Sequence, residues 1–122
     1  MDRASVEQWM QGYLKAWASD EAEDIAALFA EDARYRPRPY QPAWEGREAI
    51  VSEWIARGDK DEEWAFAYEI AAVDGAVAVI LGDTDYPDPD AQRYSNVWVI
   101  RFDADGRAVD FVEYWMRKPK PE

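Results

Sequence analysis

The sequence predicts an α+β domain in which three N-terminal helices pack on a curved antiparallel sheet. Apolar residues recur at helical spacing over the first half of the chain, and from Trp64 onward they alternate with a period of two. Two turns that contain aspartate and glycine divide the second half into strands. At 122 residues, the chain is long enough to bury most of its apolar surface as a single domain, 1–122.

The composition narrows the chemistry open to the protein. The chain has no cysteine and no histidine, which excludes thiol nucleophiles, disulfides and imidazole bases. Its 14 basic and 26 acidic residues give a formal net charge of −12, so we expect no nucleic acid and no membrane as partner. Because no basic segment precedes an apolar run and no apolar stretch is long enough to span a bilayer, we expect a cytoplasmic protein.

Helical spacing predicts two helices in the first thirty residues. Ser5 and Gln8 resemble a capping box. The apolar stripe that follows comprises Val6, Trp9, Met10, Tyr13, Leu14 and Trp17. Asp20 is expected to cap the second helix. That helix would bury Ala22, Ile25, Leu28 and Phe29 and lie antiparallel to the first.

A proline-rich segment separates the second helix from the third. Residues 34–36 form a short extended piece, and prolines end it. The following loop, residues 37–44, is rich in proline and aromatic residues, and we interpret it as a lid. Gly46 begins a third helix, in which Ile50 and Trp54 stack one turn apart.

Four strands, joined as an antiparallel meander, are predicted after residue 63. The first places one face inward, namely Trp64, Phe66, Tyr68 and Ile70. Residues 73–76 form a hairpin turn to the second strand. Either set of alternate residues on this strand could face the pocket. We expect the inward set to be Ala78, Ile80, Gly82, Thr84 and Tyr86. Gly82 would leave room for a ligand, and Asp83 and Asp85 would point outward.

Residues 95–116 predict the last two strands and the turn between them. Glu113 shares a strand face with Phe111 and Trp115, where an ionised carboxylate is costly unless it is paired, hydrated or in use. The opposite face carries Val97 and Val99, together with Val112. This apolar surface predicts a homodimer with a two-fold axis.

Three local phrases resemble the nuclear transport factor 2-like superfamily, in particular its SnoaL-like branch. They are ALFAEDARY at 27–35, GREAI at 46–50 and NVWVIRFDADGRAVDFVEYW at 96–115. The resemblance covers nearly the whole chain and implies a cone-shaped fold, a pocket between the helices and the concave sheet, and usually a homodimer. It leaves the activity open, because the family contains isomerases, dehydratases, cyclases, epoxide hydrolases and proteins with no known activity.

The similarity to the steroid isomerases of this superfamily reaches only one catalytic position. Gln11-Gly12-Tyr13 matches the phrase that carries their oxyanion-stabilising tyrosine, so the resemblance gives Tyr13 that position. Their general-base aspartate falls at Pro37, and the protonated aspartate beside the oxyanion falls at Trp98. Isomerisation by that mechanism is therefore not expected. The SnoaL-like cyclases and scytalone dehydratases depend on histidine, which this chain lacks.

Glu113 and Tyr13 are the candidate catalytic residues. Burial among aromatic rings raises a carboxyl pKa toward the range useful for proton transfer. Equally, Glu113 fits a structural role, paired with an arginine or capping a tyrosine hydroxyl, and Tyr13 fits a core position. The expected pocket residues are Trp17, Tyr35, Trp54, Tyr86, Trp98, Phe111 and Trp115, although tryptophans of this kind also fill cores.

These observations predict a small-molecule pocket protein. One interpretation is a cofactor-free acid–base enzyme, lyase, isomerase or hydratase-like, acting on an apolar carbonyl or hydroxyl compound. No dinucleotide or phosphate loop occurs, so no cofactor is expected, and neither is a metal. The alternating Arg34, Arg36 and Arg38 would attract an anionic group, pair with Glu113 or remain solvated. The alternative is a non-catalytic ligand-binding or protein-interaction module; an open cavity reaching Glu113 favours the pocket.

Overall fold

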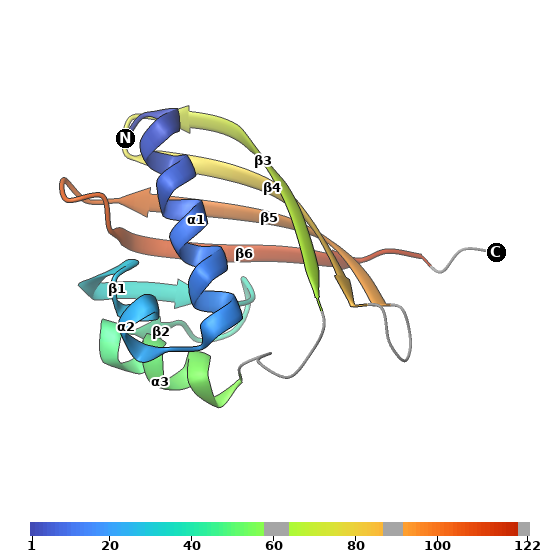
Figure 1. Ribbon diagram of the computed structural model, residues 1–122, viewed down its shortest axis with the longest axis horizontal. Coiled ribbons are helices and arrows are strands. Elements are labelled where there is room, and N and C mark those ends of the chain that lie inside the picture. The colour runs from blue at the N-terminus through green and yellow to red at the C-terminus, as the bar shows by residue number, and fades with distance from the viewer. Residues whose placement is uncertain (58–63, 87–91, 120–122) are drawn as a thin grey trace.

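The computed structural model describes residues 1–57, 64–86 and 92–119 and confirms the α+β class. The elements, in chain order, are α1 (Arg3–Ser19), α2 (Ala22–Ala26), β1 (Phe29–Arg36), β2 (Trp44–Glu45), α3 (Arg47–Ala56), β3 (Ala65–Asp74), β4 (Val77–Tyr86), β5 (Gln92–Phe102) and β6 (Ala108–Arg117). The strands form a single sheet in the order β2-β1-β6-β5-β4-β3. Figure 1 shows α1 running across one face of this curved sheet, while α2 and α3 lie beside β1 and β2.

Both ends of α1 differ from the sequence prediction. The helix is capped by Asp2, whose carboxylate accepts a 2.8 Å hydrogen bond from the backbone N–H of Ser5. At the other end, Asp20 adopts a left-handed conformation with φ of 51°, and its N–H donates to the carbonyl of Ala16. Asp20 therefore ends α1 and does not cap the second helix, because a short polar side chain tolerates the left-handed region that stops a helix.

None of the described helices has the length and apolar character needed to cross a membrane.

The second helix is shorter than predicted. It ends at Ala26, and Phe29 already begins β1, which pairs in parallel with β6 and antiparallel with β2. The sequence indicated only a short extended piece at residues 34–36. The period-two pattern of β1 is broken at its centre, where Glu31 and Asp32 are both exposed and the register against β6 shifts. This irregularity conceals the strand from a search for alternation.

The predicted four-stranded meander is confirmed by β3 to β6. Each strand pairs antiparallel with the next, and the first and last hairpins turn at glycines with positive φ, 57° at Gly75 and 79° at Gly106. Trp98 is opposite Ile80 on one side and Glu113 on the other, so these side chains share the concave face. This pairing fixes which side chains the sheet directs toward α1.

Gly82 does not leave room for a ligand. A Cβ atom at this position would lie 2.5 Å from the ring of Phe66, so the missing side chain makes space for an aromatic residue of β3. The Phe66 ring stacks in turn on Trp98, with ring centres 5.0 Å apart and planes 12° from parallel. The prediction that Ala78, Ile80 and Thr84 face inward is confirmed by their burial.

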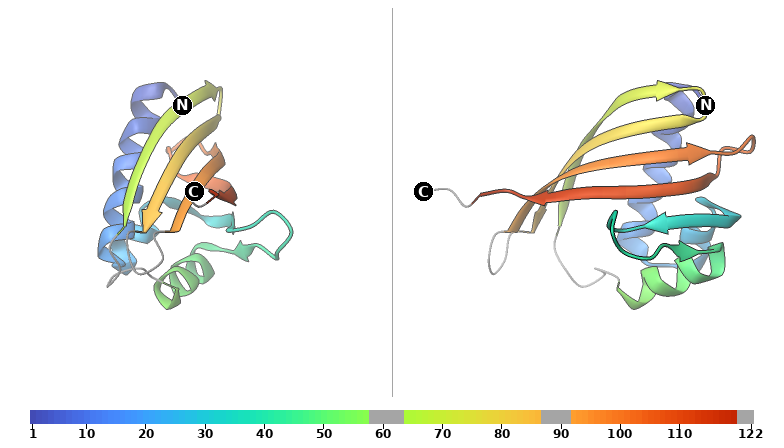
Figure 2. Two further views of the ribbon diagram at one scale, coloured as in Figure 1. Left: turned by 90° about the vertical axis from the view of Figure 1, so that its right-hand side faces the viewer. Right: turned by 180° about the vertical axis from the view of Figure 1, so that it is seen from behind.

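No described helix covers the convex face of the sheet, as the view from behind in Figure 2 shows. Leu81, Val97 and Tyr114 form one row across β4, β5 and β6 on this face. Leu81 is 39% exposed and Tyr114 is 44% exposed. The structure contains one chain, and the homodimer stays a prediction.

Candidate functional site

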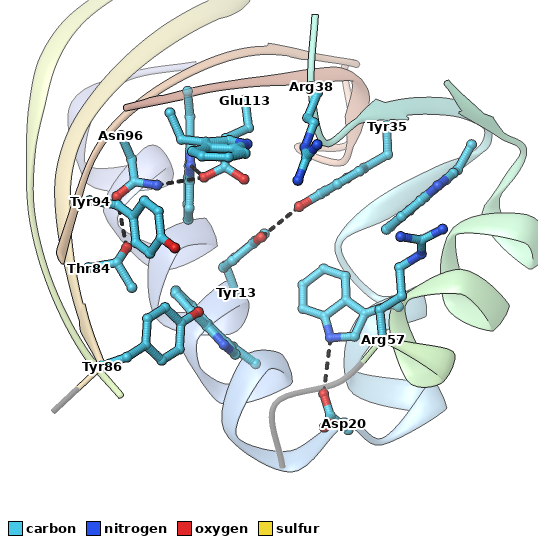
Figure 3. Close-up of a pocket in the computed structure, with 15 residues that line it drawn as sticks. Tyr13, Asp20, Tyr35, Arg38, Arg57, Thr84, Tyr86, Tyr94, Asn96 and Glu113 are labelled. Carbon is cyan, nitrogen blue, oxygen red and sulfur yellow. Dashed lines mark hydrogen bonds between the residues drawn. The ribbon is translucent and has the colours of Figure 1, made fainter. Parts of the chain in front are cut away.

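A cavity of about 330 Å³ opens between the concave face of the sheet, α1 and α3. Six of the seven side chains predicted for the pocket line it, namely Trp17, Tyr35, Trp54, Tyr86, Trp98 and Trp115. Both candidate catalytic residues, Tyr13 and Glu113, also line it. Figure 3 shows Tyr13 of α1, Tyr35 of β1, and Tyr86 and Glu113 of the sheet around one space.

Phe111 is the predicted pocket residue that the structure places elsewhere. It is fully buried and does not line the cavity. Its ring is nearly parallel to that of Tyr35, with centres 4.5 Å apart, and to that of Tyr13, with centres 5.7 Å apart. The alternation of β6 correctly puts Phe111 on the inner face, but α1 and the two tyrosines cover it. It therefore supports the tyrosine rings from behind.

The Glu113 carboxylate is held by a short chain of polar side chains from the sheet. Trp98 Nε1 and Asn96 Nδ2 each donate a 2.8 Å hydrogen bond to Glu113 Oε2. The Oγ1 hydroxyl of Thr84 donates to Asn96 Oδ1 at 2.8 Å, which orients the amide so that its nitrogen faces Glu113. Within the described part of the chain, Oε1 of Glu113 has no hydrogen-bond partner, and Figure 3 shows it directed away from Asn96.

Burial raises the pKa of the Glu113 carboxyl above its ordinary value. The hydrogen bonds from Trp98 and Asn96 favour the ionised form and lower the pKa, but the burial effect is larger. No lysine or arginine of the described residues forms a salt bridge with Glu113, which argues against the arginine-paired alternative. The carboxyl is thus held by neutral donors in an apolar setting.

Tyr13 and Tyr35 form a hydroxyl pair in the same cavity. Their hydroxyl oxygens are 2.9 Å apart, and both side chains are buried. Burial, followed by the negative charge of Glu113, raises the pKa of the Tyr35 hydroxyl. Burial also raises the pKa of Tyr13 well above its ordinary value, and Tyr35 and Glu113 add to the effect. Both hydroxyls are therefore neutral donors. One proton is used between them, which leaves the other for a ligand oxygen.

The rim of the cavity is formed by residues near the ends of helices and in the β1–β2 loop. Asp20 Oδ1 accepts a 3.2 Å hydrogen bond from Trp54 Nε1. The guanidinium carbon of Arg38 is 4.7 Å from the centre of the Trp115 ring. The guanidinium carbon of Arg57, just after α3, is 5.7 Å from the Trp44 ring centre. These contacts join charged groups to aromatic faces at the mouth.

Sequence reasoning missed several cavity residues. The alternation placed Thr84 and Asn96 on inner faces, but nothing in the pattern pointed to their hydrogen bonds with Glu113. Asp20 and Arg57 follow helices, where no periodic pattern marks a functional side chain. Among the described residues, no group of three or more carboxylates is arranged to hold a metal ion.

Comparison with solved structures shows the fold. The epoxide hydrolase/cyclase-like enzyme SalBIII, which takes part in pyran ring formation in salinomycin, is 18% identical with a TM-score of 0.73, over 94% of this chain and 93% of its own. The Δ5-3-ketosteroid isomerase from Mycobacterium sp. is 15% identical with a TM-score of 0.69, over 93% and 98%. A protein of unknown function with a cystatin-like fold from Methylobium petroleophilum PM1 is 19% identical with a TM-score of 0.73, over 100% and 82%.

The sequence itself identifies the family. No curated protein matches the chain. The profile of the SnoaL-like domain, however, matches residues 10–111, which run from the middle of α1 through the whole of β5 to the first residues of β6. The match agrees with the helices, the curved sheet and the cavity described above. The chain therefore belongs to the SnoaL-like domain family of the nuclear transport factor 2-like superfamily.

Proposed function

We propose that this SnoaL-like protein binds a small apolar carbonyl or hydroxyl compound and performs acid–base chemistry on it with Glu113 and Tyr13. One observation carries the proposal. A carboxyl whose pKa is raised by burial shares a cavity with a pair of neutral tyrosine hydroxyls. A proton acceptor beside a hydrogen-bond donor for an oxyanion is the arrangement that enolisation of a carbonyl compound requires.

The proposed reaction starts with proton transfer to Glu113. Oε1 of the ionised carboxylate removes a proton from the carbon next to the substrate carbonyl, and the electron pair of that C–H bond moves toward the carbonyl oxygen. The free hydroxyl proton of the Tyr13–Tyr35 pair donates a hydrogen bond to that oxygen as its negative charge develops. Protonated Glu113 then returns the proton to another carbon, which gives isomerisation, or to a leaving hydroxyl, which departs as water.

The fixed hydrogen bonds of Glu113 suit this role. Both donors bind Oε2, so Oε1 is left to exchange a proton with the ligand. Because the raised pKa makes the carboxylate a stronger base than an exposed glutamate, it is better matched to a weakly acidic C–H group. Trp98 and Asn96 hold the carboxylate in place throughout.

The cavity supports a small, flat ligand. Its volume of about 330 Å³ is near the lower end of the range of about 300–1,000 Å³ found for small-molecule sites. The four tryptophans predicted for the walls, Trp17, Trp54, Trp98 and Trp115, present aromatic surface to it. Because the cavity is open and includes Glu113, it favours a pocket protein over an interaction module whose interior is merely filled.

Deuterium exchange tests the proposal without knowledge of the natural substrate. The probe is 2-tetralone, an aromatic ketone, and its loss of C–H signal in D₂O is followed by NMR. We expect the protein to accelerate exchange and Glu113→Gln to reduce that acceleration by about 10²- to 10⁴-fold. Glu69→Gln is the matched control, because Glu69 is an exposed strand residue outside the cavity.

The outcomes separate the two classes of function. Equal exchange by the protein and its Glu113→Gln variant contradicts the role of Glu113. Binding of the ketone without exchange favours the alternative, a non-catalytic binding protein. Glutamine keeps a carbonyl oxygen for the donors of Trp98 and Asn96, so the variant is expected to keep the local geometry.

A further inference from the structure

Arg38 places a cation at the mouth of the cavity. It lies in the loop between β1 and β2, lines the cavity, and packs its guanidinium over Trp115, which also lines it. Figure 3 shows its side chain extending over the cavity on the same side as Tyr35. No acidic side chain of the described residues is within salt-bridge distance of Arg38. The cation thus faces the ligand space without a carboxylate partner there.

The backbone restricts Arg38 before any ligand arrives. Pro37 and Pro39 flank it, and the residue before a proline is confined largely to extended conformations. The N–H of Gln41 donates a 3.3 Å hydrogen bond to the carbonyl of Arg38, which closes a turn at this point. A restricted backbone reduces the entropy lost when the side chain is fixed on a ligand.

The contact with Trp115 leaves the donors of Arg38 available. The guanidinium carbon lies over the aromatic ring, which attracts the positive charge without supplying an oxygen that would accept from the N–H groups. Trp115 is supported in turn by an edge contact with Tyr94, at 5.4 Å between ring centres. A planar fork of N–H groups matches the two oxygens of a carboxylate.

Arg57, the other arginine of the cavity, is less suited to this task. Both arginines are exposed, but the Nε of Arg57 is 3.2 Å from Glu53 Oε2, one turn earlier on α3, so its guanidinium already has a carboxylate partner. The cavity also contains two carboxyls, Asp20 and Glu113, within a chain of net charge −12. A single unpaired guanidinium balances one negative charge, so the observations favour a monoanion over a doubly charged phosphate.

We propose that the ligand is a small, flat apolar carboxylate whose carboxylate group binds Arg38 and whose carbonyl or hydroxyl group reaches Glu113 and Tyr13. This inference rests on the proposed function, because it concerns the same cavity. It narrows the substrate class to oxo or hydroxy acids with an aromatic or apolar body. Arg38 is then the residue that sets specificity for the charged end.

Calorimetric titration with two matched probes tests the inference near neutral pH. 2-Naphthoate carries the carboxylate, and 2-naphthamide has nearly the same shape without the charge. A charge-assisted hydrogen bond is worth about 1.5–3 kcal/mol, so Arg38→Gln is expected to weaken naphthoate binding by about 10- to 150-fold. Naphthamide affinity is expected to stay within about two-fold, and Arg38→Lys to give an intermediate naphthoate affinity.

Arg34→Gln is the control variant. Arg34 carries the same charge on the neighbouring strand, pairs with Glu45 at 3.9 Å and does not line the cavity. We expect it to leave both affinities unchanged. Naphthoate binding that survives Arg38→Gln overturns the inference. Equal losses for both probes also overturn it, because they indicate that Arg38 acts by packing.

The experiment distinguishes the inference from the proposed function. If neither naphthyl probe binds but 2-tetralone exchange depends on Glu113, the proposed function stands and the carboxylate inference fails. If neither probe binds and no exchange occurs, both fail. If naphthamide binds as tightly as naphthoate, the pocket is in use and its preference for an anion is refuted.

Discussion

Trp98 and Glu113 are directly opposite each other on β5 and β6, and the indole nitrogen donates a 2.8 Å hydrogen bond to the carboxylate. Trp98 is almost completely buried, so it excludes water from the carboxyl while it stabilises the ionised form. These two effects act on the pKa of Glu113 in opposite directions. Trp98 therefore makes ionisation of Glu113 less favourable by excluding water, and its hydrogen bond offsets part of this effect.

Replacing Trp98 by phenylalanine is expected to raise the pKa of Glu113 further. Phenylalanine keeps an aromatic ring at this position to exclude water, but it removes one of the two donors to the ionised carboxylate and leaves only Asn96. The pKa is measured by NMR titration of carboxyl-labelled glutamate. Trp9→Phe is the control, because Trp9 is also buried and donates its indole N–H at 3.0 Å, but to the carbonyl of Leu28.

Two results would contradict this expectation. An unchanged Glu113 pKa in Trp98→Phe would mean that the indole bond does not stabilise the charge. An equal rise in Trp9→Phe would assign the effect to general loosening of the core. Both variants lose a buried donor, so each is expected to lower the free energy of unfolding by about 1–3 kcal/mol.

Glu113→Gln is expected to stabilise the protein near neutral pH and to have less effect near pH 4.5. The folded-state pKa of Glu113 is raised above the ordinary value of 4.5, so the folded chain retains this proton when the unfolded chain has released it. Wild-type stability therefore falls, relative to the variant, as pH rises from 4.5 through the folded-state pKa. Each unit of pKa difference between the folded and unfolded chains is worth about 1.4 kcal/mol.

Urea denaturation of both proteins at several pH values measures this difference. Comparison within the pair is needed because the chain has 26 acidic residues, and all of them except Glu113 are common to both proteins. Glu69→Gln is the control for the loss of one exposed negative charge. A stabilisation by Glu113→Gln that is constant over the whole range would contradict the raised pKa.

Removing the hydroxyls of Tyr13 and Tyr35 is expected to be non-additive. Either single change to phenylalanine leaves the other buried hydroxyl without its 2.9 Å partner, at a cost of about 1–3 kcal/mol in unfolding free energy. The double variant leaves no unpaired hydroxyl, so it is expected to cost less than the sum. Unfolding by urea for all four proteins gives the coupling energy, and additivity would show that the pair contributes nothing.

The convex face is proposed as the surface of a homodimer. Tyr114→Glu introduces a charge into the apolar row with Leu81 and Val97 and is expected to convert the dimer to a monomer. Light scattering after gel filtration gives the mass, about twice the 14.1 kDa of the chain for a dimer. Tyr40→Glu, in a loop where Tyr40 is 99% exposed, is the matched control. A wild-type monomer would refute the proposal.

The period-two alternation of the last hairpin was the most informative pattern in the sequence. It placed Trp98, Glu113 and Trp115 on the concave face, and the cavity contains all three. It also placed Phe111 on the correct face. Alternation does not tell, however, which inward-facing side chains line the cavity and which are covered by a helix, as the Phe111 ring is covered by α1. Similarly, the sequence shows that Gly82 leaves space beside β4. It does not show that the ring of Phe66, from β3, fills that space.

Features that depend on contacts between distant residues could not be predicted. Tyr35 was expected only as part of a wall, and its hydroxyl contact with Tyr13 requires β1 to pair with β6 beside α1. Asp20 was interpreted as the start of a helix, because aspartate favours both helix caps and left-handed turns. Its contact with Trp54 joins the end of α1 to α3, 34 residues later.

The Glu113 carboxylate and both of its hydrogen-bond donors lie close together in the sequence. Asn96, Trp98, Glu113 and Trp115 all belong to the β5–β6 hairpin, whereas Tyr13 and Tyr35 come from the first third of the chain. A single short exchange of coding sequence would thus replace the carboxylate and both of its donors together, with the register preserved by the hairpin. The Tyr13–Tyr35 hydroxyl pair comes from α1 and β1, so such an exchange would keep the proposed donor while it replaces the proposed base.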